Sequence, residues 1–481
     1  MTDYYDLGNY SRTISTTSPE VQLWFDRGLI WCYGFNHEES VRCFKKAVAA
    51  DPDCAIAYWG IAYAAGPNYN KPWETFDATD LTQSLTEAYT ATQAALARKD
   101  TASDVEQALI HALQHRYPSK TAADNLNLWN DNYANAMRGV YEAYPDDLDV
   151  CSLFAEALMN RTPWALWDLQ SGKAAKGAHT LEAVTLLEKV LQQIEQTDAA
   201  PHPGLLHMYI HLMEMSPHPE QALRASDTLR DLVPDSGHLQ HMPTHIDVLC
   251  GHYDNVVASN SRAIVADRKF LEREGPLNFY SMYRCHDYHF KLYGAMFLGQ
   301  YKPALDAANE MVATLSEELL RVETPPMADW TEGFVSMKMH VLIRFGQWQA
   351  ILDEPLPENQ ELFCMTTAMM YYAKGVAHAT LGNVKAADDE QQLFEATVSR
   401  VPDTRYVFNN TCLDILAIAG ETLKGELAYR TGQFNTAFAH LRKSVELDDN
   451  LPYDEPWGWM QPTRHALGAL LLEQNRVTEA E

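Results

Sequence analysis

The chain has 481 residues, of which 46% are apolar, and its 65 acidic and 37 basic residues give a formal net charge of −28. This composition is typical of a globular chain and too apolar for intrinsic disorder, and the length predicts two to four domains or one extended repeat structure. The negative field repels phosphate backbones and anionic lipid, so nucleic acid and membrane surfaces are excluded as partners, whereas cations, basic peptides and metals are favoured.

The first residues, MTDYYDLGNYSRT, are polar and acidic and lack the pattern of a signal peptide. No apolar run reaches the roughly 18 residues that a membrane-spanning helix needs. The eight cysteines are scattered along the chain without a CxxC pair, which is typical of reduced thiols inside a cell. The sequence therefore predicts a cytoplasmic protein.

The first predicted elements form a helical hairpin in the stretch WFDRGLIWCYGFNHEESVRCFKKAVAADP. Its aromatic, small and proline positions are Trp24, Gly28, Trp31, Ser40, Phe44, Ala47 and Pro52. This order resembles the tetratricopeptide repeat (TPR), a helix–turn–helix unit of about 34 residues. Similar spacings recur in GHYDNVVASNSRAI, LGQYKPALDAANEM, FGQWQAILDE, LGNVKAADDE and TGQFNTAFAHLRKSVELDD.

The resemblance implies an all-α fold, an α-solenoid in which helix pairs stack into a right-handed superhelix. We expect an N-terminal TPR-like unit over residues 1–65, degenerate helical pairs over 66–163, an insertion and helix over 164–200, histidine-rich units over 201–315 and C-terminal units over 316–481. The insertion is either a lid over the groove or a packing loop. The end of the chain, EQNRVTEAE, stops where a second helix should start. This predicts a truncated end or an oligomer partner that covers the last helix.

The family places positions two, five, nine and twelve of each repeat in the concave groove, as a stripe on one helix face. In that frame three successive units direct histidine and glutamate side chains into the groove. They are His207, His211 and Glu214 from the first unit, His238, His241 and His245 from the second, and His286 and His289 from the third. Seven of the 18 histidines lie between residues 202 and 245, which weighs against the ordinary role of a histidine as a satisfied core or surface residue.

Neutral imidazole is a favoured ligand of Zn, Cu, Fe and Ni, and the spacing His–x₃–His puts two rings on one side of a helix. The sequence therefore predicts a transition-metal cofactor, Cu, Fe or Zn, with the ligands His207, His211, His241 and His245 and with His286 or His289 as further ligands. Candidates of second rank are His238, Glu156, His37, His465 and His340. Two alternatives remain open for the cluster: a proton switch, and recognition of a peptide tail or small molecule.

Glu214 shares a helix face with His207 and His211 and is the predicted catalytic residue, either as a metal ligand or as the general base for metal-bound water. The alternative is that Glu214 forms an ion pair with Arg224 or is a solvated side chain of the groove. The resulting prediction is a metal-dependent enzyme, an oxidoreductase or hydrolase, with a small-molecule substrate. The second hypothesis is the usual role of the family, a scaffold that binds a peptide. Scaffold grooves display Lys, Arg and Asn, whereas this groove displays His and Glu, which favours metal.

Overall fold

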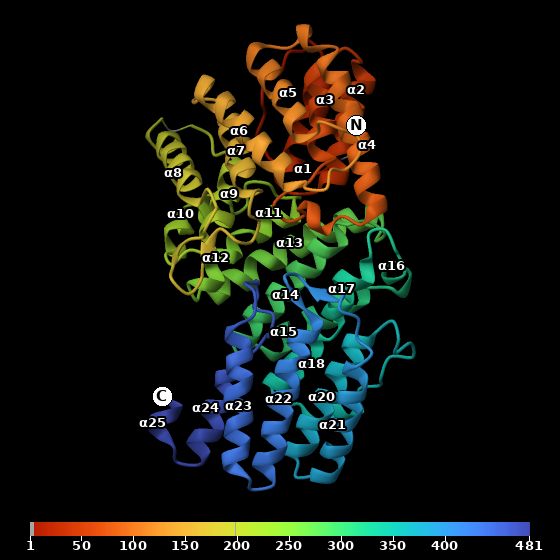
Figure 1. The fold of residues 1–481 in the computed structure, drawn as a ribbon, viewed down its shortest axis with the longest axis vertical. Coiled ribbons are helices and arrows are strands. Elements are labelled where there is room, and N and C mark those ends of the chain that lie inside the picture. Colours follow the sequence, from red (N-terminus) through yellow and green to blue (C-terminus); the bar gives the residue numbers. More distant parts are fainter. Residues whose placement is uncertain (1–3, 198) are drawn as a thin grey trace. The chain divides into compact units, whose positions relative to one another are not determined.

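A computed structural model describes residues 4–197 and 199–481. The chain divides into two compact units, Met1–Gly275 and Pro276–Glu481, so the boundary between them falls inside the predicted range 201–315. Helices dominate both units, as predicted (Figure 1), and the strands of the described residues are limited to two short antiparallel hairpins. None of the helices in the described part of the chain is both long and apolar enough to cross a membrane.

The elements of the first unit follow one another as short helices with one hairpin. They are α1 (Pro19–Tyr33), α2 (His37–Ala50), α3 (Ala55–Ala64), η1 (Trp73–Thr75), α4 (Ala78–Leu96), η2 (Lys99–Thr101), α5 (Asp104–Arg116), α6 (Asn127–Ala143), α7 (Leu148–Met159), β1 (Trp167–Asp168), β2 (Lys173–Ala174), α8 (Thr180–Thr197), α9 (Pro203–Met213), η3 (Pro219–Ala222), α10 (Leu223–Leu229), α11 (Gly237–His241), α12 (Pro243–Leu249) and α13 (Tyr253–Glu274).

The second unit has longer helix pairs towards its C-terminal end. Its elements are α14 (Ser281–Phe297), α15 (Tyr301–Thr314), α16 (Glu317–Leu320), α17 (Met327–Val335), α18 (Met337–Arg344), α19 (Trp348–Asp353), α20 (Cys364–Thr380), α21 (Val384–Val398), β3 (Tyr406–Val407), β4 (Asn410–Thr411), α22 (Cys412–Arg430), α23 (Phe434–Asp449), α24 (Thr463–Glu473) and α25 (Val477–Ala480).

Consecutive helices pack as hairpins, among them α1 with α2, α14 with α15, α20 with α21 and α22 with α23 (Figure 1). The turn glycines of the five later repeat fragments all adopt left-handed backbone conformations, with φ between 63° and 81°. They are Gly251, Gly299, Gly346, Gly382 and Gly432. A residue with a Cβ atom is disfavoured in this conformation, so glycine at this spacing ends one helix and starts the next. The chain is therefore built from TPR-like helix pairs.

Small residues let these helices approach one another, and Phe44 fills the space that they leave. A Cβ atom added to Gly60 on α3 would lie 2.5 Å from the Phe44 ring, and one added to Gly28 on α1 would lie 2.8 Å from it. Phe44 is only 1% exposed, so the ring has little room to move. The aromatic and small positions of the first repeat thus form one packing unit.

We expect Gly60→Ala to lower the free energy of unfolding by about 1–3 kcal/mol, because the added methyl group overpacks the Phe44 site. Gly139→Ala is the matched control, since a Cβ atom there meets no atom within 4 Å and lies inside α6. It should stabilise the chain by about 0.5–1 kcal/mol through helix propensity. Urea denaturation followed by circular dichroism measures both, and equal effects of the two variants would contradict this packing.

The last long helix, α24, buries part of its apolar face inside the second unit. Leu470 and Leu471 pack in a cluster with Phe438 and Leu441 of α23. Leu472 is 54% exposed. The predicted partner at this end stays a prediction.

Two helices of the first unit are buried along nearly their whole length. Every residue of α9 is buried, and so is every residue of α7 from Asp149 to Met159. Helix α9 contacts α1, α7, α8 and α12, so it is surrounded by other helices. The histidines of α9 are therefore placed in the interior of the unit.

Candidate metal centre

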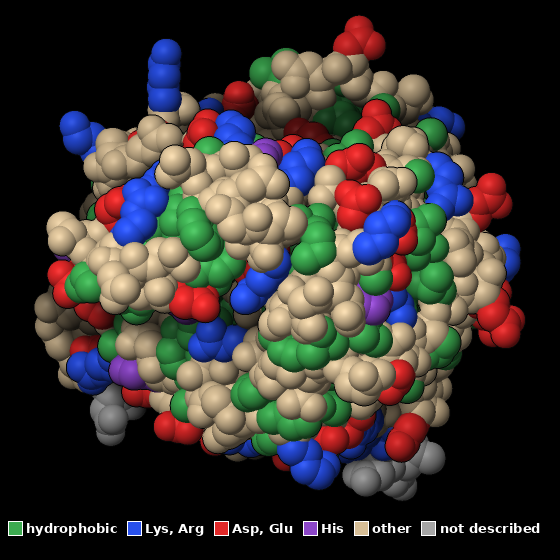
Figure 2. Space-filling view, turned by 90° about the horizontal axis from the view of Figure 1, so that it is seen from below, with side chains coloured by type: hydrophobic (Ala, Val, Ile, Leu, Met, Phe, Trp, Pro, Cys, Tyr) green, Lys and Arg blue, Asp and Glu red, His purple; other side chains and the backbone are tan. Residues whose placement is uncertain are grey.

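Helices α9, α11 and α12 bring the predicted histidines of the first unit together. Each of these side chains is at most 1% exposed: His207 and His211 on α9, Glu214 at its C-cap, His238 and His241 on α11, and His245 on α12. These residues of the predicted concave groove therefore lie in the interior, because the packing around α9 closes over the rings. The face drawn in Figure 2 shows small areas of other histidines among charged side chains of both signs.

Three rings form the tightest group. The ligand atoms of His207, His211 and His238 lie within 4.8 Å of one another, and so do those of His211, Glu214 and His245. The ring centroid of His207 is 4.8 Å from that of His211 and 4.9 Å from that of His238. Nitrogen ligands of a tetrahedral metal ion lie about 3.3 Å apart, so small side-chain shifts bring these atoms onto one ion. His238, which the sequence ranked second, therefore belongs to the central group.

Hydrogen bonds at Nδ1 set the orientation of the two rings on α9. His207 Nδ1 lies 2.6 Å from the carbonyl oxygen of Tyr33, and His211 Nδ1 lies 3.0 Å from Glu214 Oε1. Because both partners are acceptors, we assign the proton to Nδ1 and a lone pair to Nε2. Neither Nε2 atom has a hydrogen-bond partner among the described residues. This arrangement, an Nδ1–H held by oxygen and an Nε2 left for another atom, is typical of metal-binding histidines.

His241 and His245 have the same orientation. His245 Nδ1 lies 2.7 Å from Glu214 Oε2, and His241 Nδ1 lies 2.7 Å from Asn260 Oδ1. The amide of Asn260 is fixed because its Nδ2 donates to the carbonyl oxygen of Val256 at 2.8 Å. Both Nε2 atoms then carry lone pairs, yet they lie 2.8 Å apart. A cation, either a proton or a metal ion, is needed to remove this repulsion.

Burial keeps four rings of the cluster neutral. Desolvation lowers the pKa of His207, His211, His238 and His241 well below 6.5, and neighbouring imidazoles lower each of them further. These rings are therefore neutral near pH 7. Neutral imidazole is the form that binds a transition metal, so these rings already have the protonation state that metal binding requires.

Glu214 connects two of the histidines. Its two carboxylate oxygens face Nδ1 of His211 and Nδ1 of His245, at 3.0 and 2.7 Å. The alternative partner Arg224 pairs with Glu195 at 2.9 Å instead, so that part of the sequence interpretation is wrong. The contacts of Glu214 favour a positioning role, in which the carboxylate holds the tautomers of two rings.

Aromatic side chains surround the cluster. The ring centroid of Phe35 lies 4.5 Å from that of His207, 5.8 Å from that of His211 and 5.6 Å from that of His238. The ring centroids of Tyr69 and Trp164 lie 4.9 and 5.7 Å from that of His211.

Phe35 has φ 56° at the turn between α1 and α2, where the later pairs have glycine. A left-handed non-glycine residue costs about 1–3 kcal/mol and often marks a functional position. Phe35 could have been identified from the sequence, because it is a phenylalanine at the turn position where the later repeats have glycine.

Two candidates of second rank lie elsewhere in the first unit. Glu156 accepts a hydrogen bond from the hydroxyl group of Tyr63 and another from Asn160, and burial raises its pKa to about 8. His37 lies with Nε2 3.7 Å from Cys32 Sγ, and burial and the nearby Arg116 lower its pKa to about 3. Neither side chain belongs to the converging groups of the described residues in this unit.

The remaining candidates belong to the second unit. His286 and His289 lie on α14, and their ring centroids are 4.4 and 6.3 Å from that of Phe408. His289 Nε2 lies 2.7 Å from Met460 Sδ. Burial, and to a smaller extent the neighbouring His340, lower the pKa of His289 to about 3. His465 is exposed beside Arg344, with 3.4 Å between His465 Nδ1 and Arg344 Nη1, so we leave it out of the ligand set.

Metal binding at pH 6.0 should release almost no protons. A free histidine is about three quarters protonated there, whereas burial has already lowered the pKa of these four rings. Affinity should therefore stay nearly constant between pH 7.5 and 6.0 and weaken only as the pH falls towards the lowered pKa values. Calorimetric titration in buffers of different ionisation enthalpy measures the proton count. Release of several protons per ion at pH 6.0 would show that the ligands are ordinary exposed histidines.

Comparisons with known proteins add little to this description. No family model matches the chain, and none of the curated proteins matches it. Among solved structures, a TPR domain of P58(IPK) is similar at 12% identity and a TM-score of 0.23, covering 94% of this chain and 99% of that one. A structure of Naa15 and Naa10 bound to HypK-THB is similar at 13% identity and a TM-score of 0.23, covering 96% of this chain and 62% of that one. At these scores neither similarity carries an inference about function.

Proposed function

We propose that the chain is a transition-metal protein whose ion is held in the first unit by Nε2 atoms of His207, His211 and His238. His245 is connected to this group through Glu214, and His241 lies beside His245. The observation that carries the proposal is the orientation of His207 and His211: in both rings Nδ1 faces an oxygen acceptor, and Nε2 has no hydrogen-bond partner among the described residues. Buried histidines with a purely structural role would use both nitrogens in hydrogen bonds.

The donor set suits Zn, Cu, Fe or Ni, because the converging groups in the first unit contain histidine and glutamate among the described residues. Three protein ligands leave a position open for water or substrate, as in catalytic rather than structural sites. A bound ion would act there as a Lewis acid or would lower the pKa of bound water. We therefore propose a metal-dependent enzyme that acts on a small molecule, with Phe35, Tyr69 and Trp164 excluding water. His286 and His289 stay predicted further ligands.

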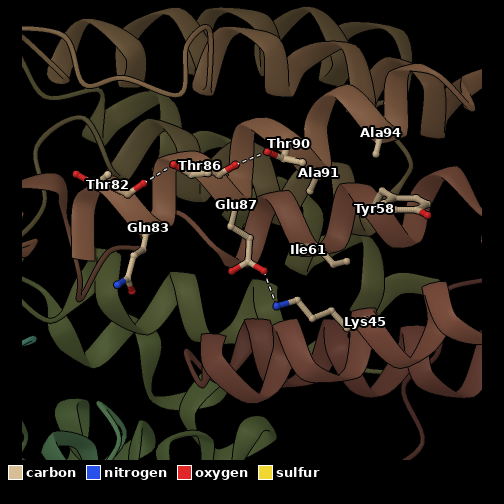
Figure 3. A pocket seen from close by; sticks show the side chains of 10 residues that line it. All are labelled: Lys45, Tyr58, Ile61, Thr82, Gln83, Thr86, Glu87, Thr90, Ala91 and Ala94. Atoms are coloured by element: carbon tan, nitrogen blue, oxygen red, sulfur yellow. Dashed lines mark hydrogen bonds and ion pairs between the residues drawn. The ribbon is translucent and has the colours of Figure 1, made fainter. Parts of the chain in front are cut away.

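The second candidate function is a peptide-binding scaffold, and a groove of about 560 Å³ between α2, α3 and α4 bears on it (Figure 3). Its two charged side chains, Lys45 and Glu87, pair with each other at 2.5 Å. The hydroxyl groups of Thr82 and Thr86 donate to carbonyl oxygens of their own helix. The lining therefore offers mainly apolar contacts and no spare charge to clamp a peptide carboxylate, which favours the metal proposal.

Elemental analysis of the full chain, purified without an affinity tag, tests the metal proposal. We expect at least about 0.8 equivalents of one transition metal per chain, because a buried multidentate histidine site retains its ion through purification. A metal content near zero, together with no uptake of Zn, Cu, Fe or Ni on titration, would favour the scaffold.

A further inference from the structure

Arg116, the last residue of α5, is a buried cation that the proposed metal centre does not use. Its side chain is 1% exposed, and its Nη2 donates to the carbonyl oxygen of Pro67 at 2.6 Å. The N–H groups on Nε and Nη1 form no hydrogen bond of good geometry among the described residues, although the Tyr133 hydroxyl group interacts with the guanidinium. An arginine side chain is always charged in proteins, so these donors carry positive charge into the interior.

The surroundings of Arg116 supply no opposite charge. The guanidinium carbon lies 4.6 Å from the ring centroid of Tyr63 and 4.8 Å from that of Tyr133, which offsets part of the desolvation cost. Tyr63 donates to Glu156, but burial raises the pKa of that carboxyl group to about 8, so it is mainly neutral at pH 7. No carboxylate of residues 4–197 and 199–481 forms an ion pair with Arg116 within the first unit. A buried cation of this kind is strongly unfavourable unless an anion binds it.

Further polar groups lie beside the guanidinium. The hydroxyl group of Tyr117 is fully buried and lacks a hydrogen-bond partner among the described residues. Its ring centroid is 5.8 Å from the guanidinium carbon. A Cβ atom on Gly66 would lie 1.8 Å from this hydroxyl, so the loop that follows α3 carries no side chain at that point. Arginine and phenol donors together are the groups that recognise a carboxylate.

We propose that Arg116 binds the carboxylate group of a small organic acid, with the Tyr117 hydroxyl as a second donor. One guanidinium balances a single negative charge, whereas a phosphate dianion would need a further cation. The nearby His37 does not supply one, and Lys71 already pairs with Asp80 at 2.6 Å. The site accordingly fits a monoanion.

The loop after α3 connects the carboxylate site to the proposed metal centre. Arg116 holds the loop after α3 through Pro67, and the same loop carries Tyr69, whose ring contacts His211 at 4.9 Å. If the metal centre is catalytic, as proposed above, the acid bound by Arg116 is its substrate. This last step rests on the proposed function, but binding of the carboxylate does not.

Thermal unfolding of the full chain with benzoate as the probe tests the site. Benzoate should raise Tm with a saturable concentration dependence, and neutral benzamide should not. The measurement is made on the protein as purified and after metal removal with 1,10-phenanthroline, a neutral chelator that does not compete for Arg116. A benzoate shift that survives metal removal supports the site whatever the outcome for the metal. The same Tm shift from benzamide as from benzoate, or an equal shift from chloride or phosphate, would overturn the carboxylate assignment.

Arg116→Gln should abolish the benzoate shift, whereas Arg224→Gln, an exposed matched control, should keep it. Without benzoate, Arg116→Gln should be at least as stable as the unaltered chain, because it removes an uncompensated buried charge. If that variant fails to fold, Tyr117→Phe supplies the test, since loss of one hydroxyl donor should weaken benzoate binding about tenfold. The proposal would be contradicted if a folded Arg116→Gln variant bound benzoate fully. If Arg116→Gln does not fold, full benzoate binding by Tyr117→Phe would contradict it.

Discussion

Replacing both His211 and His238 with alanine should reduce the bound transition metal from stoichiometric to negligible. These two rings supply two of the three ligand atoms that lie within 4.8 Å of one another, and His211 also belongs to the group with Glu214 and His245. Of the central group only His207 then remains, and one imidazole there cannot hold an ion against chelation by buffer, so affinity should fall by at least about 10³-fold. Metal content and equilibrium titration measure the loss.

The fold should survive this double substitution, because the rings are held by α9 and α11 rather than forming them. Far-ultraviolet circular dichroism should stay that of a helical chain. His252→Ala is the matched control, since its side chain is 47% exposed and lies outside the cluster. Retention of the metal by the double variant, or equal loss in the control, would show that the ion binds elsewhere.

Glu214→Gln should weaken metal binding by about 10- to 100-fold while leaving the stoichiometry at saturation unchanged. The carboxylate accepts Nδ1–H bonds from His211 and His245 at once. Glutamine offers one acceptor oxygen and one NH₂ group, so one of the two rings loses its partner or turns its other nitrogen away from the ion. The substitution keeps the size of the side chain and therefore isolates this effect from packing.

The same variant distinguishes positioning from catalysis. A general base without a positioning role predicts unchanged metal affinity and turnover lowered by about 10²- to 10⁴-fold. Glu220→Gln is the control, because that carboxylate is 56% exposed and faces His218 instead of the cluster. Unchanged metal affinity in Glu214→Gln would contradict the positioning role and return Glu214 to its predicted role as a base.

The sequence predicted the parts of the structure that depend on short-range spacing. A turn glycine followed by regularly spaced apolar residues identified the hairpins at Gly299, Gly382 and Gly432, because a left-handed turn between two helices is a local property. The shared face of His207 and His211 was equally local, since residues four apart on one helix lie side by side.

Other parts of the site depend on contacts between distant segments and could not be predicted. Tyr33 and Asn260 fix the rings of His207 and His241, and they lie 174 and 19 residues away along the chain. The repeat pattern assigned the histidine face of α9 to the concave groove, but α1, α7, α8 and α12 enclose that helix. Burial in turn lowers the pKa of the rings, so the neutral state of the cluster follows from packing rather than from spacing.

The most direct test of the metal centre is the position of the ion in a crystal of the full chain, measured by anomalous X-ray scattering at the absorption edge of the bound metal. We predict a peak about 2.0–2.1 Å from Nε2 atoms of His207, His211 and His238. A peak bound through the Nδ1 atoms, a peak outside the histidine cluster, or no peak in protein that carries stoichiometric metal would contradict the account.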